Sequence, residues 1–377
     1  MDFGLSETQE LTRKQVHEFA AAEIRPEALK YDESQEFPEH WARKMGALGL
    51  MGVFVPERYG GSGLDNVAYA ITIEELSWGC ASAGVIAAVN NGLVCEPILR
   101  FGTEEQRQRW LPDLASGRTW GAYALTEPGS GSDAAAMRGT ARPDGDEWVL
   151  NGTKAFVTNA YKASVVVTYA RTGPEKYDIS AFVVPTDSKG FIRLKKENKM
   201  GIRASDTMML GFEDCRIPKE NLLGEQGKGF NIALATLDGG RIGIAAQAIG
   251  IAQAAFDEAT KYAKERKQFD KPIAEFQAIQ FKLADMATEI DAARLLTYKA
   301  AAMKDRGERH TLESSMAKLF ASEMCNRAVK EAVQVHGGYG YIKEYLVEKL
   351  YRDAKITEIY EGTSEIQRLV ISRGLLK

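Results

Sequence analysis

The chain has 377 residues, with 48 Lys and Arg against 52 Asp and Glu, and a formal net charge of −4. Hydrophobic residues make up 45% and charged residues 27%, which is typical of a globular protein and excludes a wholly disordered chain. The balanced charge provides no general field for a polyanion, which argues against nucleic acid as the main partner. This length favours two or three domains.

Several motif classes are absent from the sequence. The four cysteines form no C-x-x-C pair and the four histidines form no H-E-x-x-H motif, so we predict neither a disulfide framework nor a metal site. Nothing matches G-x-G-x-x-G or G-x-x-x-x-G-K-[ST], so Rossmann and P-loop folds are not indicated. No stretch approaches the roughly 18–20 apolar residues of a membrane helix, and the start of the chain turns polar at once. We therefore expect a cytoplasmic protein that does not insert into a membrane.

Residues 1–118 are predicted to form an N-terminal helical domain. Ser6 and Gln9 have the spacing of a capping box, and the helix that follows should run towards Ile24 and stop before Pro26. Residues 67–78 and 83–102 are apolar and alanine-rich with little alternation, which is typical of helices buried on more than one side.

Residues 119–229 have the texture of a β-domain. Short runs rich in Val, Thr, Phe and Tyr lie at 121–127, 147–160, 163–172, 179–186 and 207–217, and turn clusters separate them. This spacing predicts an antiparallel sheet, as a small barrel or sandwich, and not a βαβ domain.

Residues 230–377 return to a helical pattern. One apolar stripe recurs at steps of three and four residues and comprises Ile279, Leu283, Met286, Ile290 and Ala293. Three or four helices of about 20 residues fit this segment, and long antiparallel helices form bundles. The predicted fold class is therefore a multi-domain α+β protein with an N-terminal helical domain, a central antiparallel β-domain and a C-terminal four-helix bundle.

Glu361 is the first candidate for chemistry. A helix is expected to end at Gly362, and the next helix to open with a capping box from Ser364 to Gln367. A carboxylate at such a junction, beside Tyr360, can lose water, and the resulting higher pKa suits a general base. A solvated glutamate in a turn is the alternative.

Three further segments are candidates for ligand binding. The turn Thr126–Asp133 and the glycine-rich break Gln334–Tyr341 both allow close approach of a ligand to the backbone. A surface turn and a plain interhelical loop are the respective alternatives. The stretch Asp238–Arg241 lies at the head of an alanine-rich helix, where Arg241 is either a buried, paired arginine or a surface charge.

Seven ordered segments together resemble the signatures of flavin-dependent acyl-CoA dehydrogenases, most closely the short-chain (butyryl-CoA) branch, over nearly the whole chain. They are YALTEPGSGSD, NGTKAFVTNA, MGIRASDT, LDGGRIGIAAQAIGIAQ, ERKQFDKPIAEFQAIQ, QVHGGYGYI and RDAKITEIYEGTSEIQ. The resemblance implies FAD as cofactor, an acyl-CoA substrate, an electron-transferring flavoprotein as partner, and a homotetramer built as a dimer of dimers.

The resemblance also implies roles for individual residues. Many relatives have Trp at the position of Phe156, so the aromatic packing is retained here and any indole N–H contact is lost. FAD contacts are expected along the flavin from Tyr123, Leu125, Thr126, Gly131, Ser132, Phe156, Val157 and Thr158, across a subunit interface from Arg266, Phe269, Gln277, Gln334, Val335, His336, Gly337 and Gly338, and finally from Thr363, Ser364 and Glu365. Substrate contacts are expected from Ser132, Asp238, Arg241, Tyr360 and Gly362.

Glu361 matches the usual catalytic base of the family. A branched-chain subgroup has its glutamate in the helix corresponding to Asp238–Arg241, where this chain has Gly240, so the base has one location in this sequence. The implied reaction is α,β-dehydrogenation of a short acyl-CoA to the trans-2-enoyl-CoA. A short branched substrate, an oxidase-like or nitroalkane-oxidase-like flavoenzyme, a non-catalytic acyl-CoA or flavin-binding subunit, and a helical interaction protein are the alternatives.

Overall fold

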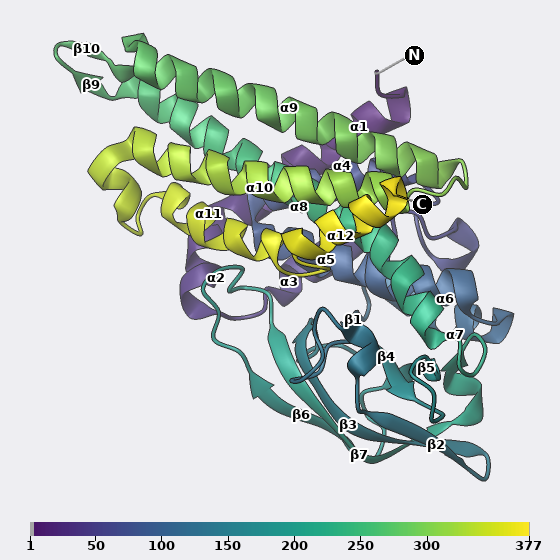
Figure 1. Ribbon diagram of the computed structural model, residues 1–377. Helices are drawn as coiled ribbons and strands as arrows, with labels where there is room; N and C mark the ends of the chain where they lie inside the picture. Colours follow the sequence, from purple (N-terminus) through teal and green to yellow (C-terminus); the bar gives the residue numbers. More distant parts are fainter. Residues whose placement is uncertain (1–3, 377) are drawn as a thin grey trace.

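The computed structural model, which describes residues 4–376, has helical domains at both ends of the chain and a β-sheet domain between them (Figure 1). In Figure 1 the sheet lies below the helices, and the long C-terminal helices run across the upper part of the molecule. The predicted fold class is confirmed. The predicted boundaries at residues 118 and 229 stay a prediction.

The N-terminal domain begins with the predicted capping box, because Gln9 N–H donates to Ser6 Oγ (3.3 Å) and Ser6 N–H donates to Gln9 Oε1 (2.9 Å). A π-helical turn extends the first helix to Ile24, and a 3₁₀ turn that contains Pro26 follows. The α-helices of this domain are α1 (Glu7–Phe19), α2 (Ala28–Ser34), α3 (Glu39–Ala47), α4 (Asn66–Gly79), α5 (Ala81–Ala88), α6 (Glu96–Phe101) and α7 (Glu104–Ala115).

One helical stretch departs from the sequence-based expectation about membranes. Ala81–Phe101, which comprises α5, a π-helical segment (Val89–Cys95) and α6, is long and apolar enough to cross a membrane. However, 94% of its most apolar window is buried inside the protein, as expected for a core helix. The amides of Asn90 and Asn91 bind backbone groups of neighbouring loops, including the N–H groups of Gly121 and Val53.

The central domain is one eight-stranded sheet with the order β6-β7-β3-β2-β4-β5-β8, and β1 pairs with β4. The pairings are antiparallel except β1–β4 and β2–β4, which are parallel. Among the described residues no pairing joins β6 to β8, so hydrogen bonds do not close the sheet into a barrel. The strands are β1 (Gly121–Ala124), β2 (Thr140–Asp144), β3 (Glu147–Thr158), β4 (Val165–Arg171), β5 (Ile179–Pro185), β6 (Phe191–Lys196), β7 (Thr207–Pro218) and β8 (Leu222–Leu223).

The C-terminal bundle contains three long helices, and two shorter helices together form its fourth member. The predicted α9 stripe faces inward: Met286, Ile290 and Ala293 are buried, and Ile279 and Leu283 pack against the core. A small hairpin projects from the end of the bundle where α8 meets α9 (Figure 1). The elements are α8 (Gly229–Glu265), β9 (Lys267–Gln268), β10 (Lys271–Pro272), α9 (Gln277–Asp305), α10 (Thr311–His336), α11 (Leu346–Ala354) and α12 (Ser364–Leu375).

Of the three hydrophobic clusters among the described residues, one joins all three domains. A single cluster joins Leu93 of the N-terminal domain, Tyr169 of the sheet and Ile249 of α8. The helix α8 is the common wall, since it packs against α4, α9, α10 and strand β5. Because buried helices and strands hold their side chains at fixed separations, a site built at this junction is rigid.

Candidate active site

Glu361 lies in the tight turn that separates α11 and α12. Both Glu361 (φ 54°) and the following Gly362 (φ 98°) adopt left-handed backbone conformations, which cost energy for a glutamate and persist only when neighbours fix them. The Gln367 amide donates to the carbonyls of Glu361 (3.2 Å) and Gly362 (2.9 Å). Lys318 Nζ of α10 also donates to the Gly362 carbonyl (2.7 Å). The turn is therefore fixed from two helices.

The helix boundaries around this turn differ from the sequence-based expectation. The α-helix ends at Ala354 and a 3₁₀ turn follows to Glu358, so it does not reach Gly362. Thr363, rather than Ser364, caps α12, because its Oγ1 accepts from the N–H of Ile366 (3.3 Å). Ser364 Oγ is buried and has no hydrogen-bond partner among residues 4–376.

The Glu361 carboxylate points into the interior, towards α8. Its Oε2 is buried and has no hydrogen-bond partner within the described chain. A Cβ added to Gly240 would lie 2.1 Å from this oxygen and 2.9 Å from Leu93 Cδ2, so only glycine leaves room for the carboxylate. Burial raises the pKa of Glu361 to about 7, although Lys318 and Arg241 act in the opposite direction. The desolvation expected from the sequence is found.

Three tyrosines from three parts of the chain surround this carboxylate. Burial, followed by the charge of Glu361, raises the pKa of Tyr69 (α4) and of Tyr360 well above their usual range, and burial with smaller contributions, Glu361 among them, does the same for Tyr123 (β1). The Tyr360 hydroxyl donates to Oε1 of Gln247 on α8, whose amide donates to the Ala81 carbonyl (2.9 Å). The site thus lies where α4, α8, β1 and the α11–α12 turn converge.

Arg241 is buried and paired, which settles the choice that the sequence left open. Only 5% of Arg241 is exposed, and its Nη1 donates to Asp238 Oδ1 (2.5 Å) and Ser315 Oγ (3.3 Å). Thr311 Oγ1 donates to the other Asp238 oxygen (2.6 Å). The Arg241 Nε–H has no partner among the described residues, so this buried donor is available to a ligand. Asp238 lies inside α8, which begins at Gly229 rather than at Asp238.

The turn Thr126–Asp133 is held open by a buried ion pair. Glu127 accepts from Lys154 Nζ (2.9 Å) and from the N–H groups of Arg138 (2.6 Å) and Gly139 (3.0 Å). Burial acts to raise the pKa of Glu127, but Lys154 and these N–H groups keep it below its usual value. A Cβ at Gly131 would meet nothing within 4 Å, so the backbone here is open to a ligand.

Phe156 of β3 lies near this turn, because the N–H of the preceding Ala155 donates to the Thr126 carbonyl (2.9 Å). It has a left-handed backbone (φ 57°), lies at an irregularity between β3 and β7, and is 68% exposed. Its neighbour Val157 is buried in the sheet core, and Leu125 is buried in the cluster that the sheet shares with the helices, so these two residues offer only backbone groups to a ligand. The remaining predicted positions here, Tyr123, Thr126, Ser132 and Thr158, are partly buried or exposed.

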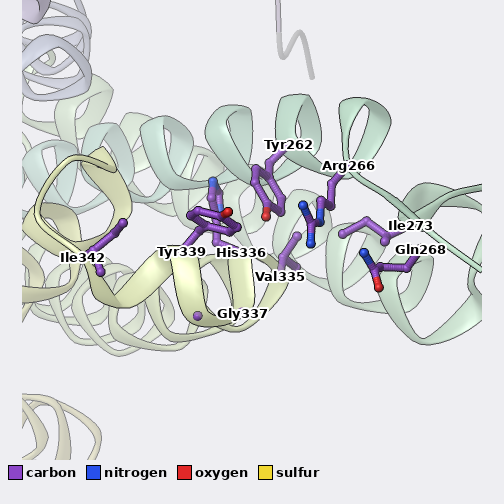
Figure 2. A pocket seen from close by; sticks show the side chains of 10 residues that line it. Tyr262, Arg266, Gln268, Ile273, Val335, His336, Gly337, Tyr339 and Ile342 are labelled. Atoms are coloured by element: carbon purple, nitrogen blue, oxygen red, sulfur yellow. The ribbon is translucent and has the colours of Figure 1, made fainter.

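A cavity of about 540 Å³ lies at the far end of the bundle (Figure 2). Figure 2 shows Tyr262 and Arg266 of α8 beside His336, and the rings of Tyr262 and His336 stack with centroids 4.3 Å apart. Val335, Gly337 and Gly338 also line this cavity. The other predicted positions, Phe269, Gln277 and Gln334, are exposed near it but do not line it.

This cavity and Glu361 are separate sites within one chain. Lys318, beside Glu361, and His336, in the cavity wall, lie 18 residues apart on α10. At 1.5 Å per residue this separation is about 27 Å. The predicted site residues therefore fall into one group around Glu361 and the C-terminal ends of strands β1 and β3, and a second group at the other end of the bundle.

Sequence reasoning missed Lys318, Gln247 and Tyr69. For Lys318 a signal was present: it lies at helical spacing among small residues that are all buried, namely Ser314, Ser315, Ala321 and Ser322. A lysine on such a stripe is directed into the protein and needs a partner there. Gln247 and Tyr69 occur in apolar helical runs and carried no comparable signal.

Family models match almost the whole chain. The acyl-CoA dehydrogenase N-terminal domain matches residues 6–118, the middle domain residues 122–215 and the C-terminal domain residues 227–376. Among curated proteins, the short-chain specific acyl-CoA dehydrogenase of Bos taurus mitochondria is 55% identical over 99% of this chain and 91% of its own length. The short-chain specific enzyme of Clostridium acetobutylicum is 50% identical over the full length of both chains.

Solved structures have the same fold. Butyryl-CoA dehydrogenase from Megasphaera elsdenii superposes with a TM-score of 0.98 at 44% identity, over all of both chains. A chain solved in work on the electron transferring flavoprotein of Acidaminococcus fermentans superposes with a TM-score of 0.99 at 46% identity, also over all of both chains. An acyl-CoA dehydrogenase of Bacillus anthracis complexed with FAD superposes with a TM-score of 0.94 at 39% identity, over 99% of this chain and 67% of that one.

Proposed function

We propose that this chain, which belongs to the acyl-CoA dehydrogenase family, is an enzyme that dehydrogenates short-chain acyl-CoA thioesters to trans-2-enoyl-CoA. The observation that carries the proposal is the buried Glu361 carboxylate, which faces Gly240 and has a pKa of about 7. A base with a pKa near the working pH is best suited to proton abstraction.

Glu361 takes the α-proton of the thioester. An α-proton is far less acidic than a carboxylic acid in water, so the site must strengthen the base and stabilise the developing enolate. Burial does the first, because a carboxylate without water is a stronger base. Glu361 has a left-handed backbone, and we assign its N–H to the thioester oxygen as an oxyanion donor. FAD, when bound, supplies the acceptor for the β-hydrogen as hydride.

The residues at the C-terminal ends of strands β1 and β3 fit a flat, partly apolar cofactor such as FAD. A phenylalanine that is mostly exposed and held in a left-handed backbone, as Phe156 is, gives a face for a planar ring. The open backbone at Gly131 allows close approach, and Ser132 and Thr158 offer hydroxyls. We assign the flavin contacts to Tyr123, Leu125, Thr126, Gly131, Ser132, Phe156, Val157 and Thr158, with Thr363, Ser364 and Glu365 on the facing turn.

We assign the cavity at the other end of the bundle to the pyrophosphate and adenosine of a neighbouring subunit's FAD. Arg266 and the open glycines Gly337 and Gly338 suit a phosphate, since a guanidinium and exposed backbone N–H groups both bind anions. The separation of about 27 Å along α10 supports a contribution to a second chain's cofactor. A dimer of dimers would satisfy this arrangement and would also cover Phe269, which is 88% exposed on the projecting hairpin.

The packing behind Tyr360 supports a short acyl chain. Gln247 is fully buried and spans the space between the Ala81 carbonyl and the Tyr360 hydroxyl. Tyr69 fills the adjoining space: its hydroxyl would lie 2.5 Å from a Cβ at Gly243 and 3.0 Å from one at Gly92. Both side chains limit the depth available to an acyl tail. Asp238 and Arg241 are assigned to the substrate, because the unpartnered Arg241 Nε–H lies beside Glu361.

An electron-transferring flavoprotein is the proposed electron acceptor, and the cytoplasm the proposed location. The first is supported by the similar chain that was solved in work on the electron transferring flavoprotein of Acidaminococcus fermentans. The second is supported by relatives from Bacillus subtilis and Clostridium acetobutylicum and by four buried, unbridged cysteines, which suit a reducing compartment.

An anaerobic titration tests the proposal. The FAD-reconstituted protein would be mixed with butyryl-CoA, octanoyl-CoA or isobutyryl-CoA, and the flavin absorbance followed. Bleaching by butyryl-CoA well before octanoyl-CoA is expected, and Glu361→Gln should retain FAD while its flavin is reduced several orders of magnitude more slowly. Preferential bleaching by isobutyryl-CoA would change the substrate to a branched one, and a protein that binds no FAD would refute the proposal.

A further inference from the structure

Among residues 4–376, three lysines are fully or nearly fully buried, and one of them lacks an ion pair. Lys154 binds Glu127, and Lys349 binds Asp353. Lys318 is completely buried, but within residues 4–376 no carboxylate lies in ion-pair contact with it. Its only recorded hydrogen bond goes to the carbonyl of Gly362, the residue after Glu361. An ammonium buried without a contacting anion destabilises the folded protein, so its presence here points to a functional role beside Glu361.

Lys318 faces Glu361 across the interior. Among the charges that act on Glu361, Lys318 is the largest that favours the ionised carboxylate, and Arg241 of α8 is the second. Burial lowers the pKa of Lys318 to about 8, while Glu361 is the main influence that raises it. The two groups therefore support one another's charged forms across the turn.

Other titratable groups also face Lys318 and Glu361 from the elements packed around them. On the side of Lys318, Glu358 of the 3₁₀ turn after α11 and Glu365 of α12 favour its charged form, and Arg241 opposes it. On the side of Glu361, the tyrosines Tyr69, Tyr123 and Tyr360 remain neutral, since their pKa values are raised well above 10. The Asp238 carboxylate accepts hydrogen bonds from Arg241 and Thr311. Lys318 and Arg241 are thus the two cations next to the base.

We propose that Lys318 is a positioning residue for Glu361: its ammonium fixes the Glu361–Gly362 turn through the Gly362 carbonyl, and its charge favours the ionised form of the carboxylate. This inference rests on the proposed function of Glu361 as the base. Lys318 does not contact the reacting atoms; it acts through the backbone that carries Glu361 and through its charge. An opposite charge within about 4–6 Å typically lowers a carboxyl pKa by about 1–3 units.

The test is the pH dependence of flavin reduction by butyryl-CoA in anaerobic stopped flow, from pH 5.5 to 9. Lys318→Met removes the charge and the donor, and its apparent pKa should lie about one unit or more above that of the wild type. Below that pKa, reduction should be roughly tenfold slower than in the wild type. Lys318→Arg retains the charge and should restore most of the wild-type profile.

Two controls separate this role from a structural one. Lys282→Met removes a lysine that pairs with Glu331 at a distant, half-exposed part of the same bundle, and should leave the pH profile unchanged. If Lys318→Met does not fold, Lys318→Gln, which has a polar head group without the charge, should show the same upward shift.

Each result supports or overturns the inference. A folded, FAD-loaded Lys318→Met or Lys318→Gln protein with the wild-type profile overturns it, and so does a Lys318→Arg protein shifted as far as Lys318→Met. A wild-type flavin that butyryl-CoA reduces, together with unshifted variants, leaves the proposed function intact and removes only the role of Lys318. A wild-type flavin that no short acyl-CoA reduces refutes the proposed function itself.

Discussion

Adding one methyl group at Gly240 should disable the base without unfolding the protein. In the Gly240→Ala variant the new Cβ would lie 2.1 Å from Glu361 Oε2. Ordinary contact between such atoms is about 3.4–3.5 Å, so the carboxylate must move by about 1.3 Å. A displacement of about 1 Å in a reacting group costs roughly a hundredfold in rate, which corresponds to about 2.7 kcal/mol. We therefore expect flavin reduction by butyryl-CoA to be about a hundredfold slower.

Stability should change little in the same variant. Alanine is favoured over glycine inside a helix by about 1 kcal/mol, and the end of the Glu361 side chain can move aside. FAD content and melting temperature would be measured beside single-turnover reduction. Gly374→Ala in α12 is the matched control, because its Cβ meets only a Leu312 side-chain carbon, at 3.3 Å. A Gly240→Ala protein reduced within threefold of the wild-type rate would refute the placement of the Glu361 carboxylate against α8.

The remaining predictions concern the charge of Glu361, the depth of the pocket and the open turn. Because Glu361 acts when deprotonated and its pKa is about 7, the reduction rate should rise with pH through about 7; a rate that is flat from pH 5.5 to 9 would contradict this assignment. Its raised pKa also means that the folded state favours the protonated acid, so stability is lost as pH rises through about 7. Glu361→Gln should therefore be more stable than the wild type at pH 8 by up to about 3 kcal/mol, with the difference vanishing near pH 4.5, as chemical denaturation would show. Gln247→Ala should raise the rate with hexanoyl-CoA relative to butyryl-CoA about tenfold, and an unchanged ratio would mean that the acyl tail does not extend towards α5. Lys154→Met should cost about 3–5 kcal/mol, because it leaves the Glu127 carboxylate buried without its partner, and Glu127→Gln in the same chain should recover most of that loss in urea unfolding.

Much of the fold could be predicted because its periodicity is local. The stripe from Ile279 to Ala293 and the capping box at Ser6 both lie within single helices, so neighbouring residues carry the signal. Strands β2 and β6 were missed because they carry no such local signal. Their exposed, charged sequences lack alternation, and pairing with β3 and β7 makes them strands.

The helix ends near Glu361 show how tertiary contacts override a local signal. The sequence favours a capping box at Ser364, but the turn is displaced by one residue and Thr363 becomes the cap. Lys318 and Gln367 bind the carbonyls of the turn, which selects its left-handed backbone. The Lys318 contact joins residues 44 positions apart, so the local sequence does not encode it. The break was therefore predictable, whereas its register was not.

The structure also explains why this site holds one carboxylate. Positions 240 and 361 lie far apart in the sequence, yet a side chain at one would occupy the space of the carboxylate at the other, since a Cβ at Gly240 would lie 2.1 Å from Glu361 Oε2. Two carboxylates there would repel each other and would both lose water, so only one could ionise. Glycine at position 240 thus leaves the space that the Glu361 carboxylate occupies. Lys318 and Arg241 favour the ionised form of this carboxylate and so reduce the free-energy cost of burying its charge.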